Sequence, residues 1–144
     1  ASLHRYFSLP SKEGLTNVLV QDDLTVDGWL QQTEVENLRV MTSGPLPPDP
    51  ADLLGSKKMH HLIECLEQEA DLIIFDTPPT LAVSDATVLA LEADAVLLVV
   101  DAGRTRSVAV RRAMEDLERA GAHVVGAVLN RVATRPSKGY YYHE

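Results

Sequence analysis

The sequence ADLIIFDTPP, residues 70–79, is the part of the chain that says most about its fold. Four apolar residues, 72–75, lead without a break into Asp76. A short, continuous apolar run predicts a strand over residues 72–76 that is buried on both faces, as in a parallel sheet covered by helices. Two consecutive prolines fix φ and remove two N–H donors, so neither strand nor helix should continue through residues 77–79.

Asp76 has two interpretations. A carboxylate at the C-terminal end of a parallel strand points into the crevice where open α/β sheets bind ligands. In P-loop nucleotide hydrolases an aspartate at this position holds Mg²⁺, usually through a water. The alternative is an ordinary strand-end aspartate that caps the following helix. The segment by itself favours neither interpretation.

Segments on both sides of this strand alternate between strand and helix patterns. Residues 95–100 and 123–129 predict two more buried strands. Residues 104–120 predict a long helix between them, which Gly121 should end. Upstream, residues 38–42 predict a short strand. This alternation predicts a single α/β domain, with a mostly parallel sheet and helices on both faces.

Three shorter helices are predicted before and after the central strand. One is amphipathic, because four apolar side chains repeat at i, i+3, i+4 and i+7. These side chains are Met59, Leu62, Ile63 and Leu66. Before it, Asp49 should cap a helix that Gly55 interrupts. After the prolines, Ser84 or Asp85 should cap a short helix through Leu91.

The composition is that of one globular domain with a sizeable core. The chain has 144 residues, of which 45% are hydrophobic and 24% are charged. No apolar run approaches the ~20 residues of a membrane span. The single cysteine, Cys65, excludes an internal disulfide framework and predicts a reducing, cytoplasmic compartment. A net charge of −8 argues against non-specific binding to nucleic acid.

Polar residues follow each of the three long strands. If the strands are parallel, Asp76, Asp101 and the pair Asn130 and Arg131 come to one edge of the sheet. Asp76 would serve a metal ion, and Arg104 could approach a phosphate. The Asn130 amide has a donor and an acceptor, which matches an adenine edge, and Arg131 could stack on the base. The constellation predicts a nucleotide site.

The phosphate-binding half of such a site is missing from the sequence. A P-loop enzyme needs G-x-x-x-x-G-K-[ST] to surround the phosphates with backbone N–H groups and a cation. The sequence contains neither this motif nor G-x-G-x-x-G. Gly-Lys-like pieces occur at residues 55–57 and 138–139, but neither follows an apolar strand and opens a helix.

Three features together resemble the bacterial tyrosine kinases. They are the pattern G-x-x-P-P-x-P-x-x-L-L at residues 44–54, D-T-P-P at residues 76–79, and a terminal run of three tyrosines. This family comprises the cytoplasmic ATPase domains of capsular and exopolysaccharide chain-length regulators, among the partition-type P-loop ATPases. The resemblance covers almost all of the chain. D-T-P-P alone would not separate this family from other partition-type ATPases.

The resemblance implies a role for several residues. Asp76 is similar to the Walker B aspartate that coordinates Mg²⁺ in catalysis, and Asn130 and Arg131 to a base-contacting pair. The implied switch segment is Thr77, Pro78 and Pro79. The implied phosphoacceptors, modified by a neighbouring subunit, are Tyr140, Tyr141 and Tyr142. In that family the P-loop lies upstream, so residues 1–132 resemble a C-terminal portion, followed by a flexible tail, 133–144.

Three functions stay open, and so does the question whether this chain is itself an enzyme. The resemblance implies an ATP-dependent, autophosphorylating protein-tyrosine kinase that regulates capsule and exopolysaccharide polymerisation and export. It would use Mg²⁺ and ATP or ADP, assemble with itself, and meet a membrane-embedded activator at the inner face of the membrane. The missing P-loop favours a non-catalytic interaction module or fragment instead. A partition-type positioning ATPase is the third possibility, against which the tyrosine run argues.

Overall fold

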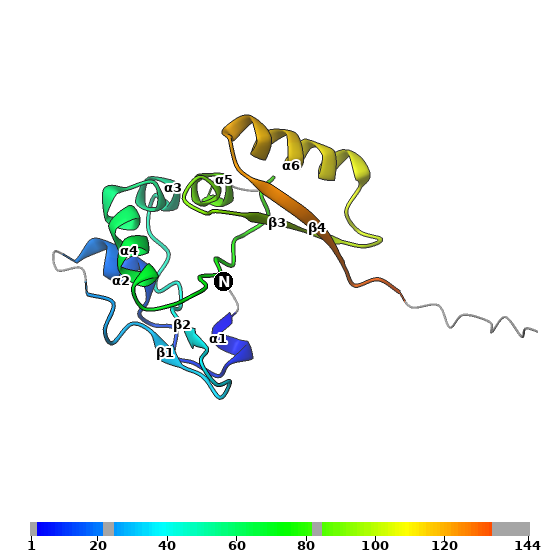
Figure 1. Cartoon of the computed structure of the whole chain (residues 1–144). Coiled ribbons are helices and arrows are strands. Elements are labelled where there is room, and N and C mark those ends of the chain that lie inside the picture. Colours follow the sequence, from blue (N-terminus) through cyan, green and yellow to red (C-terminus); the bar gives the residue numbers. More distant parts are fainter. Residues whose placement is uncertain (1–2, 22–24, 82–84, 134–144) are drawn as a thin grey trace, which may run out of the picture.

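The computed structural model describes residues 3–21, 25–81 and 85–133. Figure 1 shows the elements in chain order. They are α1 (Leu3–Tyr6), α2 (Leu15–Val20), β1 (Gln31–Gln32), β2 (Arg39–Val40), α3 (Pro50–Leu54), α4 (Lys57–Glu67), α5 (Asp85–Ala90), β3 (Val96–Asp101), α6 (Ser107–Ala120) and β4 (Val124–Asn130). None of the helices in the described ranges has the length and apolar character that a membrane crossing requires.

The apolar core is built around α4. Its predicted stripe is confirmed, because Met59 and Leu62 are fully buried and Ile63 and Leu66 nearly so. Residues of α2 and Leu89 of α5 complete the buried cluster. The helix begins where the Ser56 side chain accepts a hydrogen bond from the Met59 N–H at 3.2 Å. A capped, amphipathic helix can therefore bury its apolar face against neighbours from this chain alone.

The short helix α3 also forms as its sequence predicts. The Asp49 side chain accepts a hydrogen bond from the Asp52 N–H at 3.4 Å, and Pro50 occupies the first turn, where its missing N–H has no cost. The break at Gly55 is confirmed, since α3 ends at Leu54 and a new cap at Ser56 starts α4.

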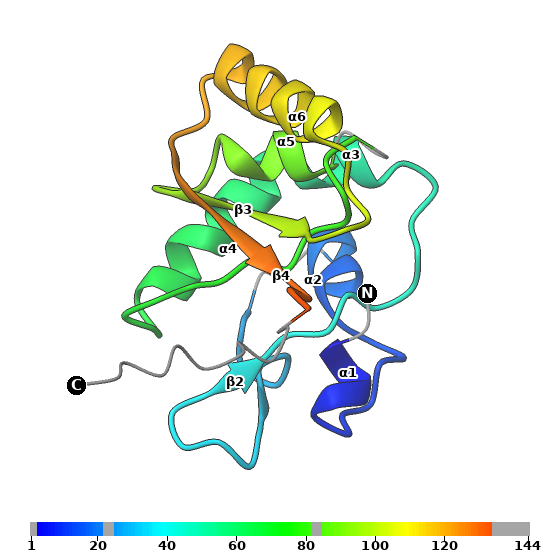
Figure 2. The same ribbon diagram turned by 90° about the vertical axis from the view of Figure 1, so that its right-hand side faces the viewer.

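Two small sheets are present in the described residues. Strands β3 and β4 pair in parallel, with Val100 opposite Leu129 and Asp101 opposite Asn130. Helix α6 connects them and lies along one face (Figure 2). Strands β1 and β2 form an antiparallel pair, of which only β2 is predicted from the sequence. Helices joined to a parallel sheet confirm the α/β class.

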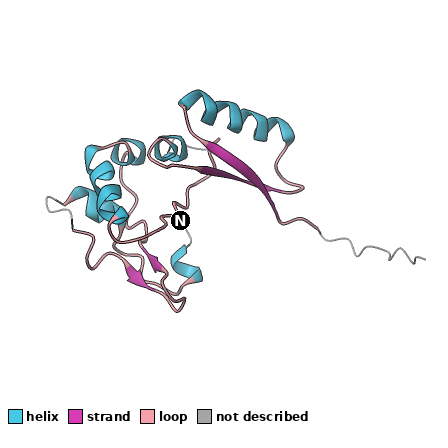
Figure 3. Ribbon diagram, viewed as in Figure 1, coloured by secondary structure: helices cyan, strands magenta, loops and turns pink. Residues whose placement is uncertain are grey.

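The predicted strand over residues 72–76 is wrong. The chain runs there as a loop between α4 and α5 (Figure 3) and pairs with no strand among the described residues. Ile73 and Phe75 pack against the core, whereas the Leu72 and Ile74 residues are 75% and 81% exposed. This alternation indicates extended backbone. A strand needs a neighbour for its N–H and C=O groups, and the described residues provide none.

The ends of α6 show how local backbone geometry sets a boundary. The helix begins at Ser107, three residues later than predicted. A turn precedes it, in which the Asp101 carbonyl accepts from the N–H groups of Arg104 and Thr105, with Gly103 at φ 79°. Gly121, at φ 92°, ends the helix in the left-handed conformation as predicted. Of the two predicted caps of α5, Ser84 lies outside the described residues.

Candidate nucleotide site

The carboxyl ends of β3 and β4 bring two predicted site residues together. The parallel register places Asp101 directly opposite Asn130. The Ala102 N–H donates to the Asn130 carbonyl at 2.8 Å, so the pairing continues one residue beyond β3. The expected meeting of these residues at one edge of the sheet is therefore observed. Their role in binding stays a prediction.

Arg131 folds back over this edge. Its backbone is left-handed, with φ 57°, and its N–H donates to Asn130 Oδ1 at 2.8 Å. The side chain then reaches the neighbouring strand, where Nη1 donates to Asp101 Oδ2 at 2.7 Å. The guanidinium stays largely exposed, with 66% of the side chain accessible to solvent. A flat cation is thus held at the end of the sheet with most of its side chain open to solvent.

Sequence reasoning missed this ion pair, although a signal for it exists. Asp101 and Arg131 carry opposite charges and stand at the ends of two segments predicted to be neighbouring strands. Aligning those strand ends would have placed the two side chains within reach. The other Asp101 oxygen, Oδ1, is buried and has no hydrogen-bond partner among the described residues. It remains an acceptor for a group that the described residues do not supply.

The Asn130 side chain keeps its two donors. Its Oδ1 accepts from the Arg131 N–H, whereas its NH₂ group carries two donors that are suited to acceptor nitrogens on a purine edge. Asn130 is exposed, as is Arg104 in the turn before α6. Arg104 forms no ion pair with another described residue. Its exposed charge is compatible with a phosphate, and it makes no hydrogen bond to Asn130.

Asp76 occupies a different part of the molecule. It is exposed, and it lines a groove of about 950 Å³ that is floored by the core. The described contacts do not join Asp76 to Asp101 or to Asn130. Thr77, Pro78 and Pro79 follow it as exposed residues without assigned secondary structure. The structure therefore brings together the β3 and β4 part of the predicted site and leaves the Asp76 part separate.

Asp76 could bind Mg²⁺ only as a single carboxylate ligand, with waters and phosphates as the other ligands. The described residues hold no group of three or more His, Cys, Asp or Glu side chains that could enclose a metal ion. Mg²⁺ does not need such a group, because it keeps several waters and is commonly bound through one or two carboxylates plus substrate phosphates. A single exposed carboxylate suits that arrangement, with Asp76 as one ligand.

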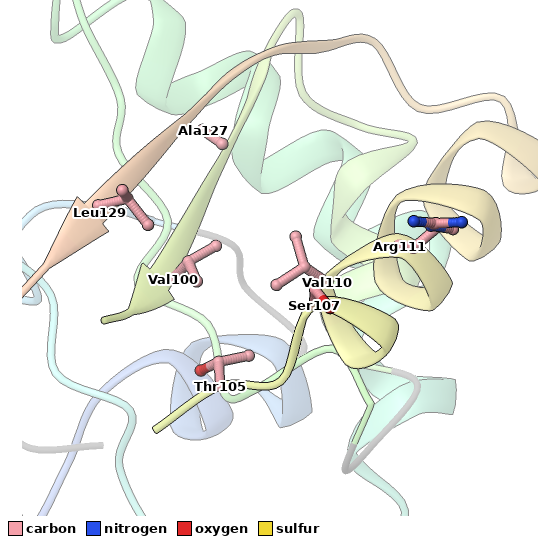
Figure 4. Close-up of a pocket in the computed structure, with 7 residues that line it drawn as sticks. All are labelled: Val100, Thr105, Ser107, Val110, Arg111, Ala127 and Leu129. Carbon is pink, nitrogen blue, oxygen red and sulfur yellow. The ribbon is translucent and has the colours of Figure 1, made fainter. Parts of the chain in front are cut away.

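A second hollow, of about 470 Å³, lies between the β3–β4 sheet and the first turns of α6 (Figure 4). It is lined by Val100, Thr105, Ser107, Val110, Arg111, Ala127 and Leu129. Side chains alternate between the faces of a sheet, so Val100 and Leu129 point to the face opposite Asp101 and Asn130. This hollow is an apolar gap under α6 and not part of the candidate site. The predicted phosphoacceptors, Tyr140, Tyr141 and Tyr142, lie outside the described residues.

Curated relatives of this chain are bacterial tyrosine-protein kinases, although no protein-family model matches it. CapB of Staphylococcus aureus is 38% identical over 140 residues, which are 97% of this chain and 61% of CapB. The tyrosine-protein kinase YwqD of Bacillus subtilis is 37% identical over 142 residues, 97% of this chain and 60% of YwqD.

Solved kinase domains share its fold. The kinase domain of the Escherichia coli tyrosine kinase ETK superposes with a TM-score of 0.81 at 35% identity, covering 96% of this chain and 56% of that one. The VpsO kinase domain superposes with a TM-score of 0.83 at 34% identity, covering 92% of this chain and 65% of that one. The chain is therefore a homologue of the bacterial tyrosine-protein kinases, and it spans about three fifths of the length of CapB and YwqD.

Proposed function

We propose that this chain forms the base-contacting and metal-facing half of the nucleotide site of a bacterial tyrosine kinase. The observation that carries the proposal is the junction of Asp101, Asn130 and Arg131 at the carboxyl ends of two parallel strands. Open α/β sheets bind ligands at this edge. The relatives are tyrosine-protein kinases, which use ATP, so the nucleotide is ATP or ADP.

The base is recognised by Asn130 and Arg131. The Asn130 NH₂ group donates to an acceptor nitrogen of the purine, while the Arg131 guanidinium stacks on the ring. Asp101 acts through Arg131, because its carboxylate holds the guanidinium at 2.7 Å and restricts the rotamers of a long side chain. Stacking costs less entropy when the cation is positioned before the nucleotide arrives.

The phosphate end involves Asp76 and Arg104. Asp76 holds Mg²⁺, which when bound neutralises charge on the phosphate oxygens. Arg104, on the turn after β3, contributes a positive charge on the same side as the strand ends. The sequence contains no glycine-rich cradle, so phosphoryl transfer also requires backbone donors from polypeptide outside these 144 residues.

The proposed reaction is autophosphorylation on tyrosine. The acceptors are the hydroxyl groups of Tyr140, Tyr141 and Tyr142, and the donor is ATP bound to another copy of the chain. The activity would regulate capsule or exopolysaccharide production on the cytoplasmic side of the membrane, together with a membrane-embedded activator. A phosphate adds about −1.5 to −2 charges to each tyrosine, which would repel the acidic body of a neighbour and favour disassembly.

A second function, a non-catalytic module, is favoured by one observation, the missing phosphate cradle. Without those N–H donors the chain loses the largest source of charge stabilisation in phosphoryl transfer. The chain would then act only through its surface and its tyrosines. The two functions differ in whether the edge formed by Asn130 and Arg131 binds a nucleotide.

Titration with ADP and Mg²⁺, followed by NMR chemical shifts, separates them. The kinase proposal predicts shifts confined to residues 101, 130 and 131 and to Asp76, with the Asp76 shifts lost when Mg²⁺ is omitted. Asn130→Ala should weaken binding by about 3- to 10-fold, the value of a hydrogen bond or two. Arg112→Ala is a matched control, because Arg112 also pairs with an aspartate, Asp116, at 3.8 Å, but on α6. Shifts scattered over the surface, or none, would support the non-catalytic module.

A further inference from the structure

The hollow between the β3–β4 sheet and α6 combines an apolar lining with polar groups (Figure 4). We call it the α6 hollow. Its volume of about 470 Å³ lies in the range of small-molecule pockets. Four apolar residues line it from the strands and the helix, namely Val100, Ala127, Leu129 and Val110. Thr105, Ser107 and Arg111 add two hydroxyl groups and a guanidinium. The α6 hollow therefore suits a group with an apolar body and an anionic end.

The surface beside the α6 hollow carries unbalanced positive charge. Residues 102–114 contain four arginines and no acidic residue, in a chain whose net charge is −8. The four, all exposed, are Arg104, Arg106, Arg111 and Arg112. Among the described residues, Arg112 alone of these forms an ion pair, with Asp116 at 3.8 Å. The acidic residues of α6 lie in its second half, beyond residue 114. An anion at the α6 hollow would therefore meet mainly positive charge.

The C-terminal tail leaves the sheet beside the same turn. Leu129, which lines the α6 hollow, is followed by Asn130, the last residue of β4. Asn130 lies opposite Asp101, whose carbonyl accepts the Thr105 N–H at 2.9 Å. Ten residues, 130–139, separate Leu129 from the first tail tyrosine. Fully extended, they span about 35 Å, which is ample for the chain to turn back to the hollow.

We infer that the α6 hollow binds a phosphorylated tyrosine from the tail of the same chain, one of the three at residues 140–142. The aromatic ring lies between Val110 and the strand residues, where it meets apolar side chains. The phosphate accepts hydrogen bonds from the Arg111 guanidinium and from the hydroxyl groups of Thr105 and Ser107. A tyrosine without phosphate offers no anion, so docking follows modification.

Two properties of phosphotyrosine favour it over other anions. Its phosphate carries about −1.5 to −2 charges at neutral pH, more than a carboxylate, and arginine clusters are a recurring means of binding phosphorylated segments. Its ring fills an apolar hollow, which the flat surface of an anionic membrane cannot enter. A ligand with both properties is available in the tail, because three of the four tyrosines of the chain stand there.

The inference rests on the proposed function in one respect, that the tail is phosphorylated. Its consequence is regulatory, because a tail held on its own chain is withdrawn from the active sites of neighbouring copies. A short tether holds its ligand at an effective concentration of about a millimolar, so a modest affinity is sufficient. Phosphate installed by chemical synthesis tests the docking without any kinase activity. A chain that fails to bind nucleotide could therefore still bind its phosphorylated tail.

Fluorescence anisotropy with synthetic peptides of residues 134–144 tests the docking. One peptide carries phosphotyrosine at residues 140–142, one carries unmodified tyrosine, and one carries phosphoserine instead. Each is titrated with the full 144-residue chain. We expect the phosphotyrosine peptide to bind at least about 10-fold more tightly than the unmodified peptide, through charge-assisted hydrogen bonds. It should bind at least about 5-fold more tightly than the phosphoserine peptide, which lacks the ring. Equal affinity of the phosphotyrosine peptide and either of the others would overturn the proposal.

Matched variants place the contact. Arg111→Gln removes the guanidinium at the α6 hollow, whereas Arg119→Gln removes one near the other end of α6, whose side chain is 76% exposed. We expect Arg111→Gln to weaken the phosphotyrosine peptide at least about 10-fold and Arg119→Gln less than about twofold. Ala127→Leu fills the hollow, so it should weaken the phosphotyrosine peptide but not the phosphoserine peptide. Equal weakening by the two arginine variants would contradict a specific site. Unfolding curves check that every variant is folded.

A chain that carries the phosphates on its own tail decides between the same copy and a neighbour. It is made by chemical ligation of the synthetic phosphotyrosine segment. We expect the NMR signals of the Thr105, Ser107 and Arg111 amides to move by the same amount at every chain concentration. Movement only at high concentration, with association in sedimentation, would assign the hollow to a neighbour's tail and contradict the inference. Binding of phosphatidylserine vesicles that Arg111→Gln abolishes, without peptide binding, would assign the arginines to a membrane instead.

Discussion

Helix α4 and the segment 72–76 each carry four large apolar side chains, yet some of these side chains lie in opposite environments. Met59 and Leu62 of α4 are fully buried, whereas Ile74 is 81% exposed. A helix satisfies its own backbone and needs only a partner for one face. A central strand needs neighbours on two edges and two faces. The comparison teaches that the same number of apolar side chains can be fully buried in a helix and remain partly exposed in an extended segment that has no neighbouring strand.

Truncation of one apolar side chain in each region is the strongest test of this comparison. Leu62→Ala should lower the free energy of unfolding by about 2–5 kcal/mol, because it removes buried methyl groups and leaves a cavity. Ile74→Ala should change it by no more than about 0.5 kcal/mol, as at other exposed positions. Urea unfolding followed by circular dichroism measures both. Similar losses for the two variants would mean that Ile74 is buried in solution, and the comparison would fail.

A glycine beside the buried core around α2 and α4, Gly14, should give the next largest effect. A Cβ added to Gly14 would lie 2.0 Å from the Thr42 carbonyl oxygen, so the backbone would have to move. Gly14→Ala should therefore destabilise the chain by about 1–3 kcal/mol, as overpacking does. In the two-stranded sheet of β3 and β4, a Cβ on Gly126 would meet only Leu97 Cδ1, at 3.8 Å. Gly126→Ala should not destabilise, and a loss as large as that of Gly14→Ala in thermal unfolding would contradict this account.

The parts of the fold that could be predicted are those whose hydrogen bonds and helix caps come from residues close together in the sequence. The start of α3 follows from Asp49, the presence of α4 from its apolar stripe, and the end of α6 from Gly121. Strands β3 and β4 were predictable because they are adjacent through a single helix crossover. The strand over residues 72–76 was not, since no described residue pairs with its backbone.

The candidate site divides in the same way. The meeting of Asp101 and Asn130 follows from parallel pairing and could be predicted from the ends of two apolar runs. Aligning the strand ends would also have brought Arg131 near Asp101, but the geometry of their bond depends on a left-handed residue at the end of β4, which the sequence does not indicate. Short elements such as β1, with two residues, carry too little periodicity to be predicted from sequence.

The ion pair at the open sheet edge should contribute less than the buried side chains. Arg131 and Asp101 are in contact at 2.7 Å, but their side chains are 66% and 27% exposed. Exposed pairs are typically worth about 0.2–1 kcal/mol, because water and salt screen them. A double-mutant cycle with Arg131→Ala and Asp101→Ala should give a coupling in this range that falls in 1 M salt. A coupling that does not change with salt would show that the edge is shielded in solution.

The smallest effect should come from His60, which joins α4 to the chain just after α5. Its Nδ1 lies 2.8 Å from Glu92 Oε2, and its Nε2 lies 3.6 Å from Glu64 Oε1. The hydrogen bond with Glu92, and then the negative charges of Glu92 and Glu64, raise the pKa of His60 above 6.5. The folded state therefore binds the proton more tightly than the unfolded state does.

The sign of the pH dependence follows from this raised pKa. The stabilisation by protonated His60 is fully present below pH 6.5, the pKa of the unfolded group, and is lost as the pH rises through the higher folded pKa. The unfolding free energy of the wild type relative to His60→Gln should thus be greater at pH 5.5 than at pH 8. Glu64 stays ionised at both values, because the hydrogen bond from His61 lowers its pKa. In Glu92→Gln the His60 pKa, measured by NMR titration, should fall towards 6.5. A His60 pKa that is unchanged in this variant would mean that His60 of α4 does not contact Glu92 in solution.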